Sequence, residues 1–211
     1  MTGPSPGTFP AYHSMNNDFS LSAIPGRLAF DIDGVFGNVM ELFIRLAREL
    51  YRIDSIRYED ITEYYLYDCL PIEPAIINQL IEKILDYPYA LEMNPIDQSV
   101  PVLTQYAQKH PLTFITARDK AQPIRDWVTR TLNQVDPNQI QVIATGEHHL
   151  KLGVLKELGF HYYVDDHLDT CRLLYEHEIT PIVFDQPWNQ KEHPFYRVSN
   201  WGEIGDILLK N

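Results

Sequence analysis

The chain has 211 residues, of which 45% are hydrophobic and 22% are charged, and its formal net charge at pH 7 is −12. This composition is typical of a globular protein and excludes a wholly disordered or collagen-like chain. The negative charge would repel the phosphates of a nucleic-acid polymer, so we expect no such partner. An anionic small molecule remains compatible with the chain if a metal ion and cationic side chains line its pocket.

Nothing in the sequence indicates a membrane or a secretory route. No continuous apolar run approaches the ~18 residues of a membrane span, and the first residues lack the basic and apolar regions of a secretory signal. The two cysteines, Cys69 and Cys171, are far apart and predict neither a disulfide framework nor a metal knuckle. We therefore expect a cytoplasmic protein with no membrane partner.

Glycine and proline interrupt residues 1–26, which predicts a disordered tail ahead of the fold. Regular structure is expected to begin with a short buried strand at residues 28–30. Apolar residues at three- and four-residue steps then predict helices at residues 36–53, 58–70 and 72–85. A fourth helix is expected at residues 100–110.

Beyond residue 111 the predicted strands and helices alternate with short connections. This alternation predicts an α/β fold, a three-layer Rossmann-like parallel sheet with a helical cap inserted after the first strand. The cap would occupy residues 37–95, and the core residues 27–36 and 96–211. The predicted strands are residues 112–116, 139–145, 162–164 and 181–184, and the predicted helices are residues 122–134, 149–158, 168–177 and 202–210, with Gly159 ending the second of these.

Polar side chains follow three of the predicted strands. Asp31 and Asp33 end the first strand, Thr116 ends the second, and Asp165 with Asp166 ends a later one. The carboxyl ends of parallel strands meet at one edge of a sheet, so these side chains are expected to share a pocket. The inserted cap would lie above the same edge.

These residues together suit phosphoryl chemistry. Neighbouring carboxylates raise one another's pKa values, and a Mg²⁺ ion relieves this repulsion. Lys151, near the start of a predicted helix, and Thr116 could hold the remaining phosphate oxygens. One aspartate could attack phosphorus to form an aspartyl phosphate. A second could protonate the leaving oxygen and later deprotonate water.

Four segments resemble, in order and spacing, the motifs of the haloacid-dehalogenase-like (HAD-like) phosphatases. They are Phe30-Asp31-Ile32-Asp33-Gly34-Val35, Phe114-Ile115-Thr116-Ala117-Arg118, Lys151, and Val164-Asp165-Asp166. The resemblance implies Mg²⁺-dependent hydrolysis of a phosphomonoester through an aspartyl phosphate.

The same resemblance assigns roles to the residues of these motifs. It implies Asp31 as the nucleophile and Asp33 as the general acid and base. Phosphate binding is implied for Thr116, Ala117, Arg118 and Lys151. The implied Mg²⁺ ligands are Asp31, the backbone carbonyl of Asp33, and the Asp165–Asp166 pair, with Asp165 expected as the direct ligand and Asp166 expected partly to support it.

A narrower resemblance is to the 5′(3′)-deoxyribonucleotidases and their bacterial relatives. It rests on the cap and on residues 126–128, 166–170, 184–189 and 199–204. It implies a 5′-nucleotidase acting on (deoxy)nucleoside monophosphates and leaves a homodimer open. Thr116 is followed here by Ala117-Arg118, which is closer to generic HAD-like members than to the Thr-Ser pattern of the characterised nucleotidases. This departure concerns the identity of the substrate rather than the chemistry.

Other functions remain as alternatives. The nearest is a HAD-like phosphatase for another small metabolite, such as a sugar phosphate. A haloacid dehalogenase is disfavoured because it would not need the acid and base Asp33. A non-catalytic binding protein is disfavoured because the set of motif residues is complete.

Several aromatic and basic side chains carry expectations of their own. Seven tyrosines lie between residues 51 and 89; most are expected to pack between cap and core, and one or two to stack on a nucleobase. Arg118 either lines the pocket or pairs with Asp119, and Trp188 is either structural or functional. His148, His149, His161 and His167 match no zinc pattern and are expected at the surface.

Overall fold

A computed structural model describes residues 27–209. The disordered tail predicted for residues 1–26 lies outside the described residues. Six parallel strands form one sheet in the order β3-β2-β1-β4-β5-β6. The chain order reverses beside β1, which creates the switch point where such sheets bind ligands. The strands are β1 (Leu28–Phe30), β2 (Leu112–Thr116), β3 (Ile140–Ala144), β4 (Tyr162–Asp165), β5 (Thr180–Phe184) and β6 (Tyr196–Val198).

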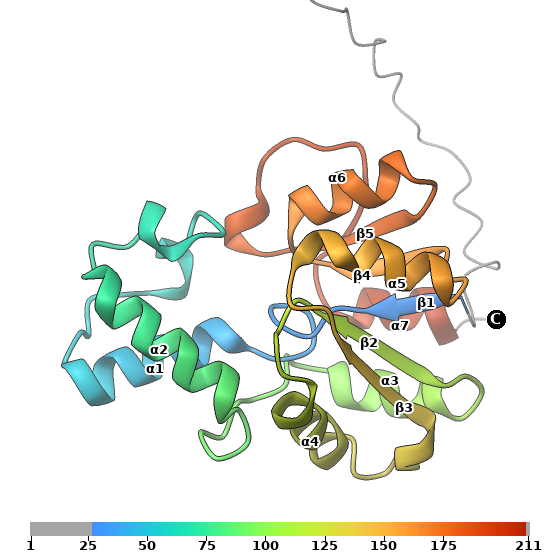
Figure 1. Cartoon of the computed structure of the whole chain (residues 1–211), viewed down its shortest axis with the longest axis horizontal. Helices are drawn as coiled ribbons and strands as arrows, with labels where there is room; N and C mark the ends of the chain where they lie inside the picture. Colours follow the sequence, from blue (N-terminus) through green and yellow to red (C-terminus); the bar gives the residue numbers. More distant parts are fainter. Residues whose placement is uncertain (1–26, 210–211) are drawn as a thin grey trace, which may run out of the picture.

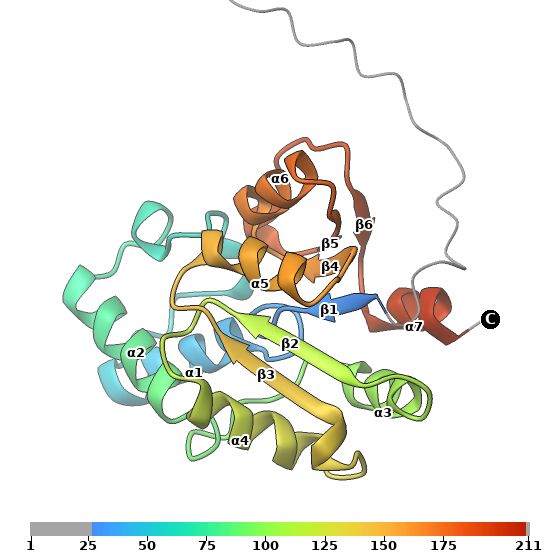
Figure 2. The same ribbon diagram turned by 45° about the vertical axis from the view of Figure 1, so that its right-hand side comes forward.

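Helices cover both faces of this sheet (Figure 2). One face carries α3 (Ser99–Ala107), α4 (Ala121–Thr131) and α7 (Trp201–Leu209), and the other carries α5 (Lys151–Glu157) and α6 (Leu168–Glu176). Successive strand residues alternate between two apolar clusters, because side chains of a strand point to opposite faces. The predicted α/β fold with a parallel sheet between two helical layers is confirmed.

Two further helices are inserted between β1 and α3 (Figure 1). These are α1 (Val39–Tyr51) and α2 (Pro74–Asp86), which pack on each other. We call residues 39–86 the helical insertion. It follows directly on the carboxyl end of β1, so it lies beside the switch point. The assignment of residues 37–95 as a cap domain stays a prediction.

The ends of the inserted helices follow local chemistry. The side chain of Asn38 accepts a hydrogen bond from the Glu41 amide and caps α1, and Arg52 ends that helix in the left-handed conformation. Pro74 occupies the first position of α2, where its missing N–H costs nothing. These features place the predicted helices within a few residues of their observed ends.

The helix predicted at residues 58–70 is wrong. Two 3₁₀ turns, Tyr58–Asp60 and Leu66–Asp68, stand there instead. The Asp60 carboxylate accepts a hydrogen bond from the Arg57 amide, which stabilises a tight turn in place of a continuing helix. The buried residues Ile61, Leu66 and Leu70 fix this segment by packing rather than by helical spacing.

Two smaller differences occur within the core. Strand β6 was not predicted, because it has three residues and pairs with β5 alone. The helix predicted at residues 149–158 begins with a 3₁₀ turn, His148–Leu150, before α5. Gly159 follows α5 with a φ of 73°, as its predicted role at the helix end requires.

Candidate active site

Three predicted aspartates meet at the switch point between β1 and β4. Phe30 pairs with Val164 in register, so Asp31 and Asp165 occupy the next positions of adjacent strands. The Asp31 amide donates to the Val164 carbonyl at 2.8 Å, which extends the pairing to the strand ends. Asp31, Asp165 and Asp166 are buried, and one carboxylate oxygen from each lies within 4.8 Å of the others.

Lys151 is the cation of this cluster. Its ammonium donates to Oδ2 of Asp165 at 3.0 Å and lies 3.1 Å from Oδ1 of Asp31. The side chain is fully buried, at the first residue of α5. Burial alone would lower the pKa of Lys151, but the carboxylates of Asp165 and Asp31 outweigh it and raise that pKa. Lys151 therefore remains charged inside the protein.

One lysine does not neutralise three buried carboxyl groups. Burial raises the pKa of Asp31 to about 7, against the opposing effect of Lys151, and the charge of Asp165 adds to the rise. The pKa of Asp166 is also raised well above its usual range, by burial first and then by Asp165 and Asp31. The cluster therefore favours either added protons or a bound cation.

The hydrogen bonds leave specific oxygens of the cluster free. Both oxygens of Asp165 are occupied, since Oδ2 accepts from Lys151 and Oδ1 accepts from the His167 amide at 2.9 Å. Within residues 27–209, Oδ1 of Asp166 accepts no hydrogen bond, and neither does Oδ1 of Asp31, although Lys151 is near it. Buried polar atoms are rarely left without a hydrogen bond, so two such oxygens within one compact carboxylate cluster fit a hard divalent cation.

The loop after β5 holds Asp166 in place. The Trp188 indole donates to Oδ2 of Asp166 at 2.8 Å, and the Asn189 amide donates to the Asp166 carbonyl at 2.9 Å. Gly34, with a φ of 80°, lies against the same carboxylate, and a Cβ there would be 2.2 Å from Oδ2. Trp188, which the sequence left open, thus contacts a site residue. The role of Asn189 was missed, and its only sequence signal is its place in the 184–189 segment.

Asp33 lies apart from the three buried aspartates. Its carboxylate accepts two hydrogen bonds from Arg118, from Nε at 2.8 Å and from Nη2 at 2.7 Å. The third contact of the guanidinium is Nη1 with the Leu85 carbonyl, at 3.0 Å. The carboxylate paired with Arg118 is therefore that of Asp33, and not that of the neighbouring Asp119.

Thr116 and Ala117 directly precede Arg118 in the sequence. Thr116 is buried at the carboxyl end of β2, and its Oγ1 accepts a hydrogen bond from the Arg118 amide at 3.3 Å. Ala117 is half-buried in the loop that follows. Their part in phosphate binding stays a prediction.

The expectation for the histidines is half wrong. His149 and His161 are exposed, but His167 is buried and His148 is half-buried. The centroids of these two rings lie 4.4 Å apart, and the Tyr64 ring of the insertion packs with its centroid 4.0 Å from that of His167. The Tyr64 hydroxyl also forms a hydrogen bond with Nε2 of His148 at 3.1 Å. Burial lowers the pKa of His148 to about 4, so this imidazole is neutral at pH 7.

The expectation for the tyrosines also fails in part. Tyr58 and Tyr64 contact the core, the former through a hydrogen bond to Gln186 at 2.9 Å. Tyrosine has an apolar ring and a polar hydroxyl, so its side chain can lie partly in water. A segment rich in tyrosine therefore need not form a buried interface. Four of the seven are exposed on the insertion and the segment after it: Tyr65, Tyr67, Tyr87 and Tyr89.

Five polar contacts between the insertion and the core form what we call the seam. Three are hydrogen bonds: Tyr58 with Gln186, Tyr64 with His148, and Arg118 with the Leu85 carbonyl. The other two are the ion pairs Glu63–Lys191 at 2.9 Å and Asp86–Lys120 at 2.8 Å. The lysines of these two pairs are exposed, so each pair contributes little to stability. Buried apolar side chains of the insertion and of the core also belong to one continuous cluster. The insertion therefore meets the core through both exposed ion pairs and buried apolar packing.

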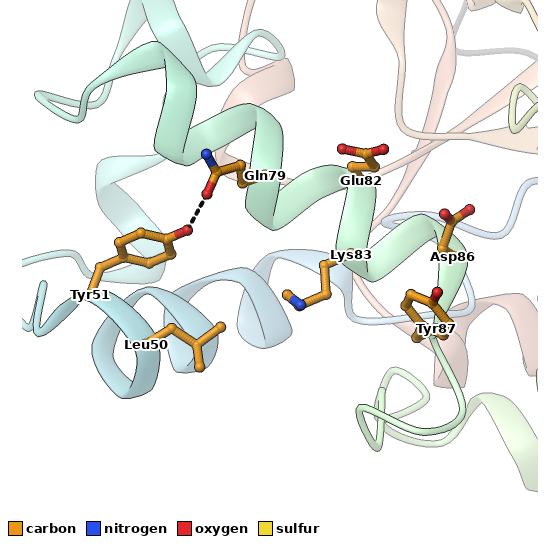
Figure 3. A pocket seen from close by; sticks show the side chains of 7 residues that line it. All are labelled: Leu50, Tyr51, Gln79, Glu82, Lys83, Asp86 and Tyr87. Carbon is orange, nitrogen blue, oxygen red and sulfur yellow. Dashed lines mark hydrogen bonds between the residues drawn. The ribbon is translucent and has the colours of Figure 1, made fainter.

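A cavity and a groove lie on the insertion, and the cavity reaches Asp166 of the aspartate cluster. A cavity of about 220 Å³ between insertion and core is lined by residues that include Tyr64, Asp166, His167 and Trp188. A larger groove of about 570 Å³ runs between α1 and α2 (Figure 3). Its lining residues are Leu50, Tyr51, Gln79, Glu82, Lys83, Asp86 and Tyr87, so its volume belongs to the insertion and not to the aspartate cluster.

Comparison with known proteins identifies relatives of the sequence. Residues 26–211 match the family profile described as 5′ nucleotidase, deoxy (pyrimidine), cytosolic type C protein (NT5C). The chain is 26% identical over 136 residues to the 5′(3′)-deoxyribonucleotidase of Bacillus subtilis (strain 168), a match that covers 63% of this chain and 72% of the relative.

Solved structures share the fold at low sequence identity. A haloacid dehalogenase-like hydrolase from Streptococcus pneumoniae matches 84% of this chain and 95% of its own with a TM-score of 0.56 and 15% identity. A HAD-superfamily hydrolase from Ehrlichia chaffeensis matches 89% of this chain and 97% of its own with a TM-score of 0.55 and 11% identity. Among the described residues, no helix is both long and apolar enough to cross a bilayer.

Proposed function

We propose that this chain, which belongs to the 5′ nucleotidase, deoxy (pyrimidine), cytosolic type C family, hydrolyses (deoxy)nucleoside monophosphates in a Mg²⁺-dependent reaction. The chain is thus a HAD-like phosphatase, and its substrate and site roles are our proposal. The observation that carries it is the buried cluster of Asp31, Asp165 and Asp166 around Lys151, at the switch point of a parallel sheet.

The hydrogen bonding of the three carboxylates supports a choice of the residues that would hold the metal. Among the described residues, Oδ1 of Asp166 accepts no hydrogen bond, and Oδ1 of Asp31 has the Lys151 ammonium 3.1 Å away without a hydrogen bond. Both oxygens of Asp165 accept hydrogen bonds. We therefore assign Asp31 and Asp166 as the direct carboxylate ligands, with the Asp33 carbonyl beside them, in place of the Asp165 expected from the sequence. Asp165 would instead orient Lys151. A Mg²⁺ ion held by these residues would neutralise the charge of the phosphate.

The residues of this chain divide the chemistry between them. A carboxylate oxygen of Asp31 attacks phosphorus, the bond from phosphorus to the nucleoside oxygen breaks, and Asp33 gives that oxygen its proton. Asp33 then takes a proton from water, which attacks the aspartyl phosphate and releases inorganic phosphate and free Asp31. Lys151, Thr116 and the backbone at Ala117 would hold the other phosphate oxygens.

The proposal is tested by phosphate release from a panel of substrates. Purine and pyrimidine nucleoside monophosphates, in ribo and deoxy forms, are compared with sugar phosphates, each with Mg²⁺ and with excess chelator. We expect the highest kcat/KM on a deoxynucleoside monophosphate, and loss of activity on chelation that Mg²⁺ restores and Ca²⁺ restores poorly. A sugar phosphate as the best substrate would contradict the nucleotidase assignment. Full activity in chelator would contradict the mechanism.

A further inference from the structure

Arg118 connects two groups that lie on different parts of the chain. Its guanidinium grips the Asp33 carboxylate with Nε and Nη2, and its Nη1 donates to the Leu85 carbonyl near the end of α2. The side chain is 2% exposed, against 26% for Asp33. A buried guanidinium loses its hydration, so each of these acceptors is needed to offset that cost.

The geometry of the pair fixes the carboxylate and not only its charge. A planar fork that donates two parallel hydrogen bonds sets both the position and the plane of the carboxylate it holds. The same contact occupies the edge of the guanidinium that a bidentate grip on a phosphate would use. The phosphate-binding role expected for Arg118 from the sequence stays a prediction, and a phosphate would have to use the N–H groups that Asp33 and the Leu85 carbonyl leave free.

We propose that Arg118 is a positioning residue, which sets the Asp33 carboxylate for proton transfer and makes its placement depend on the docked end of α2. This inference rests on the proposed phosphatase function, in which Asp33 is the acid and base. When the end of α2 departs from the core, Nη1 of Arg118 loses the Leu85 carbonyl, and the fork that holds Asp33 loses its third anchor. Proton transfer is thus tied to the insertion being in place over the site.

The seam offers a matched control for Arg118. Lys120, two residues along the same loop, pairs with Asp86 at the same end of α2. Figure 3 shows the side chain of Asp86 at that end. The Lys120 side chain is 66% exposed, and its ammonium has no contact with Asp33 among those described for residues 27–209. Lys120→Gln therefore removes a contact to α2 while leaving the Asp33 fork intact.

The first test measures how activity depends on the leaving group. For Arg118→Gln we expect kcat on a nucleoside monophosphate to fall by about 10- to 100-fold, because a misplaced acid protonates the leaving oxygen poorly. On an aryl phosphate, whose leaving oxygen needs little protonation, the fall should be under about 3-fold. Arg118→Lys should recover only part of the loss, since an ammonium cannot form the fork. Lys120→Gln should change either rate by less than about 2-fold.

Two results of this test would overturn the proposal. One is an equal loss on both substrates that appears as a raised KM, which would make Arg118 a phosphate-binding residue. The other is the same leaving-group pattern in Lys120→Gln, which would show that the fork does not carry the effect.

The second test needs no activity and separates this inference from the proposed function. Amide hydrogen exchange is measured for residues 83–87 in wild type, Arg118→Gln, Asp33→Asn and Lys120→Gln. Asp33→Asn keeps the side-chain size and removes the charge, so it should speed exchange at the end of α2 at least about 3-fold, as Arg118→Gln does. Unchanged amide exchange in Asp33→Asn would contradict the proposed coupling between Asp33 and the end of α2. A wild-type chain that lacks phosphatase activity but shows this coupling would contradict only the proposed function.

Discussion

The aspartate cluster and the seam both contain charged groups, but they are held in different ways. Asp31, Asp165 and Lys151 are almost without exposure, and their backbones belong to paired strands or to the first turn of α5. The ion pairs of the seam are largely exposed and join separate parts of the chain. Burial therefore fixes the charges of the cluster, whereas the exposed ion pairs of the seam remain open to water and contribute little to stability.

The largest expected effect breaks the cluster at its centre. Asp31→Asn removes the attacking carboxylate and a metal ligand, so kcat should fall by at least about 10³-fold and no phosphoenzyme should form. Asp33→Asn leaves the nucleophile and should cost about 10²- to 10⁴-fold, and less on an aryl phosphate. Rapid-quench trapping with labelled substrate checks this. Equal phosphoenzyme in the two variants, or Asp31→Asn as the more active one, would mean that the roles are reversed.

A second change strains the backbone beneath the cluster. Gly34→Ala places a Cβ 2.2 Å from the Asp166 carboxylate at a φ of 80°, so it should destabilise the fold by more than about 1 kcal/mol. Gly153→Ala is the control, because its Cβ meets nothing within 4 Å and the residue lies inside α5. That variant should be neutral or more stable by about 0.5–1 kcal/mol. Urea unfolding measures both, and similar free energies of unfolding for the two variants would contradict the close packing of Gly34.

The third prediction uses pH to test the charge of the cluster. Burial raises the pKa of Asp31 from 3.8 to about 7, so folding favours its protonated form. That stabilisation is complete below about pH 4 and is lost as pH rises through about 7. In chelator the Tm should therefore fall between pH 5 and pH 8. Mg²⁺ should raise the Tm more at pH 8 than at pH 5, because it binds the ionised carboxylates.

Thermal unfolding of wild type and Asp166→Asn measures this effect. The variant lacks one buried charge and one proposed ligand, so its Tm in chelator should depend less on pH and should gain less from Mg²⁺. The same gain from Mg²⁺ at pH 5 and pH 8 in wild type would show that the cation does not replace protons at the cluster.

The smallest expected effects lie in the seam. Glu63→Gln removes an exposed ion pair with Lys191 and should change the free energy of unfolding by less than about 1 kcal/mol. Tyr64→Phe removes a part-buried hydrogen bond to His148 and should cost about 1 kcal/mol. Added salt should erase the effect of Glu63→Gln and not that of Tyr64→Phe. If the exposed pair proves the more costly of the two, the seam is more permanent than its exposure indicates.

Much of the core could be predicted from the sequence because its signals are local. Strand β2 was predicted at its observed residues, since a buried run of five apolar and threonine residues between a turn and a helix has few other interpretations. The convergence of Asp31 and Asp165 followed from topology alone, because parallel strands bring their carboxyl ends to one edge. The 58–70 segment failed because packing, and not periodicity, determines its two turns.

By itself, the sequence determined the α/β fold, the chain order of the motifs and the aspartates that share the switch point. Those features depend on the periodicity of apolar residues and on the order of the strands along the chain, and both can be recognised from local sequence patterns. The tertiary structure decided which oxygens stay free in the cluster, that Asp33 pairs with Arg118, and that His148 and His167 lie under Tyr64. These arrangements depend on contacts between distant residues, such as the hydrogen bonds between Asp33 and Arg118, which are 85 positions apart in the chain. A local sequence pattern does not determine which donor pairs with which acceptor over such a separation.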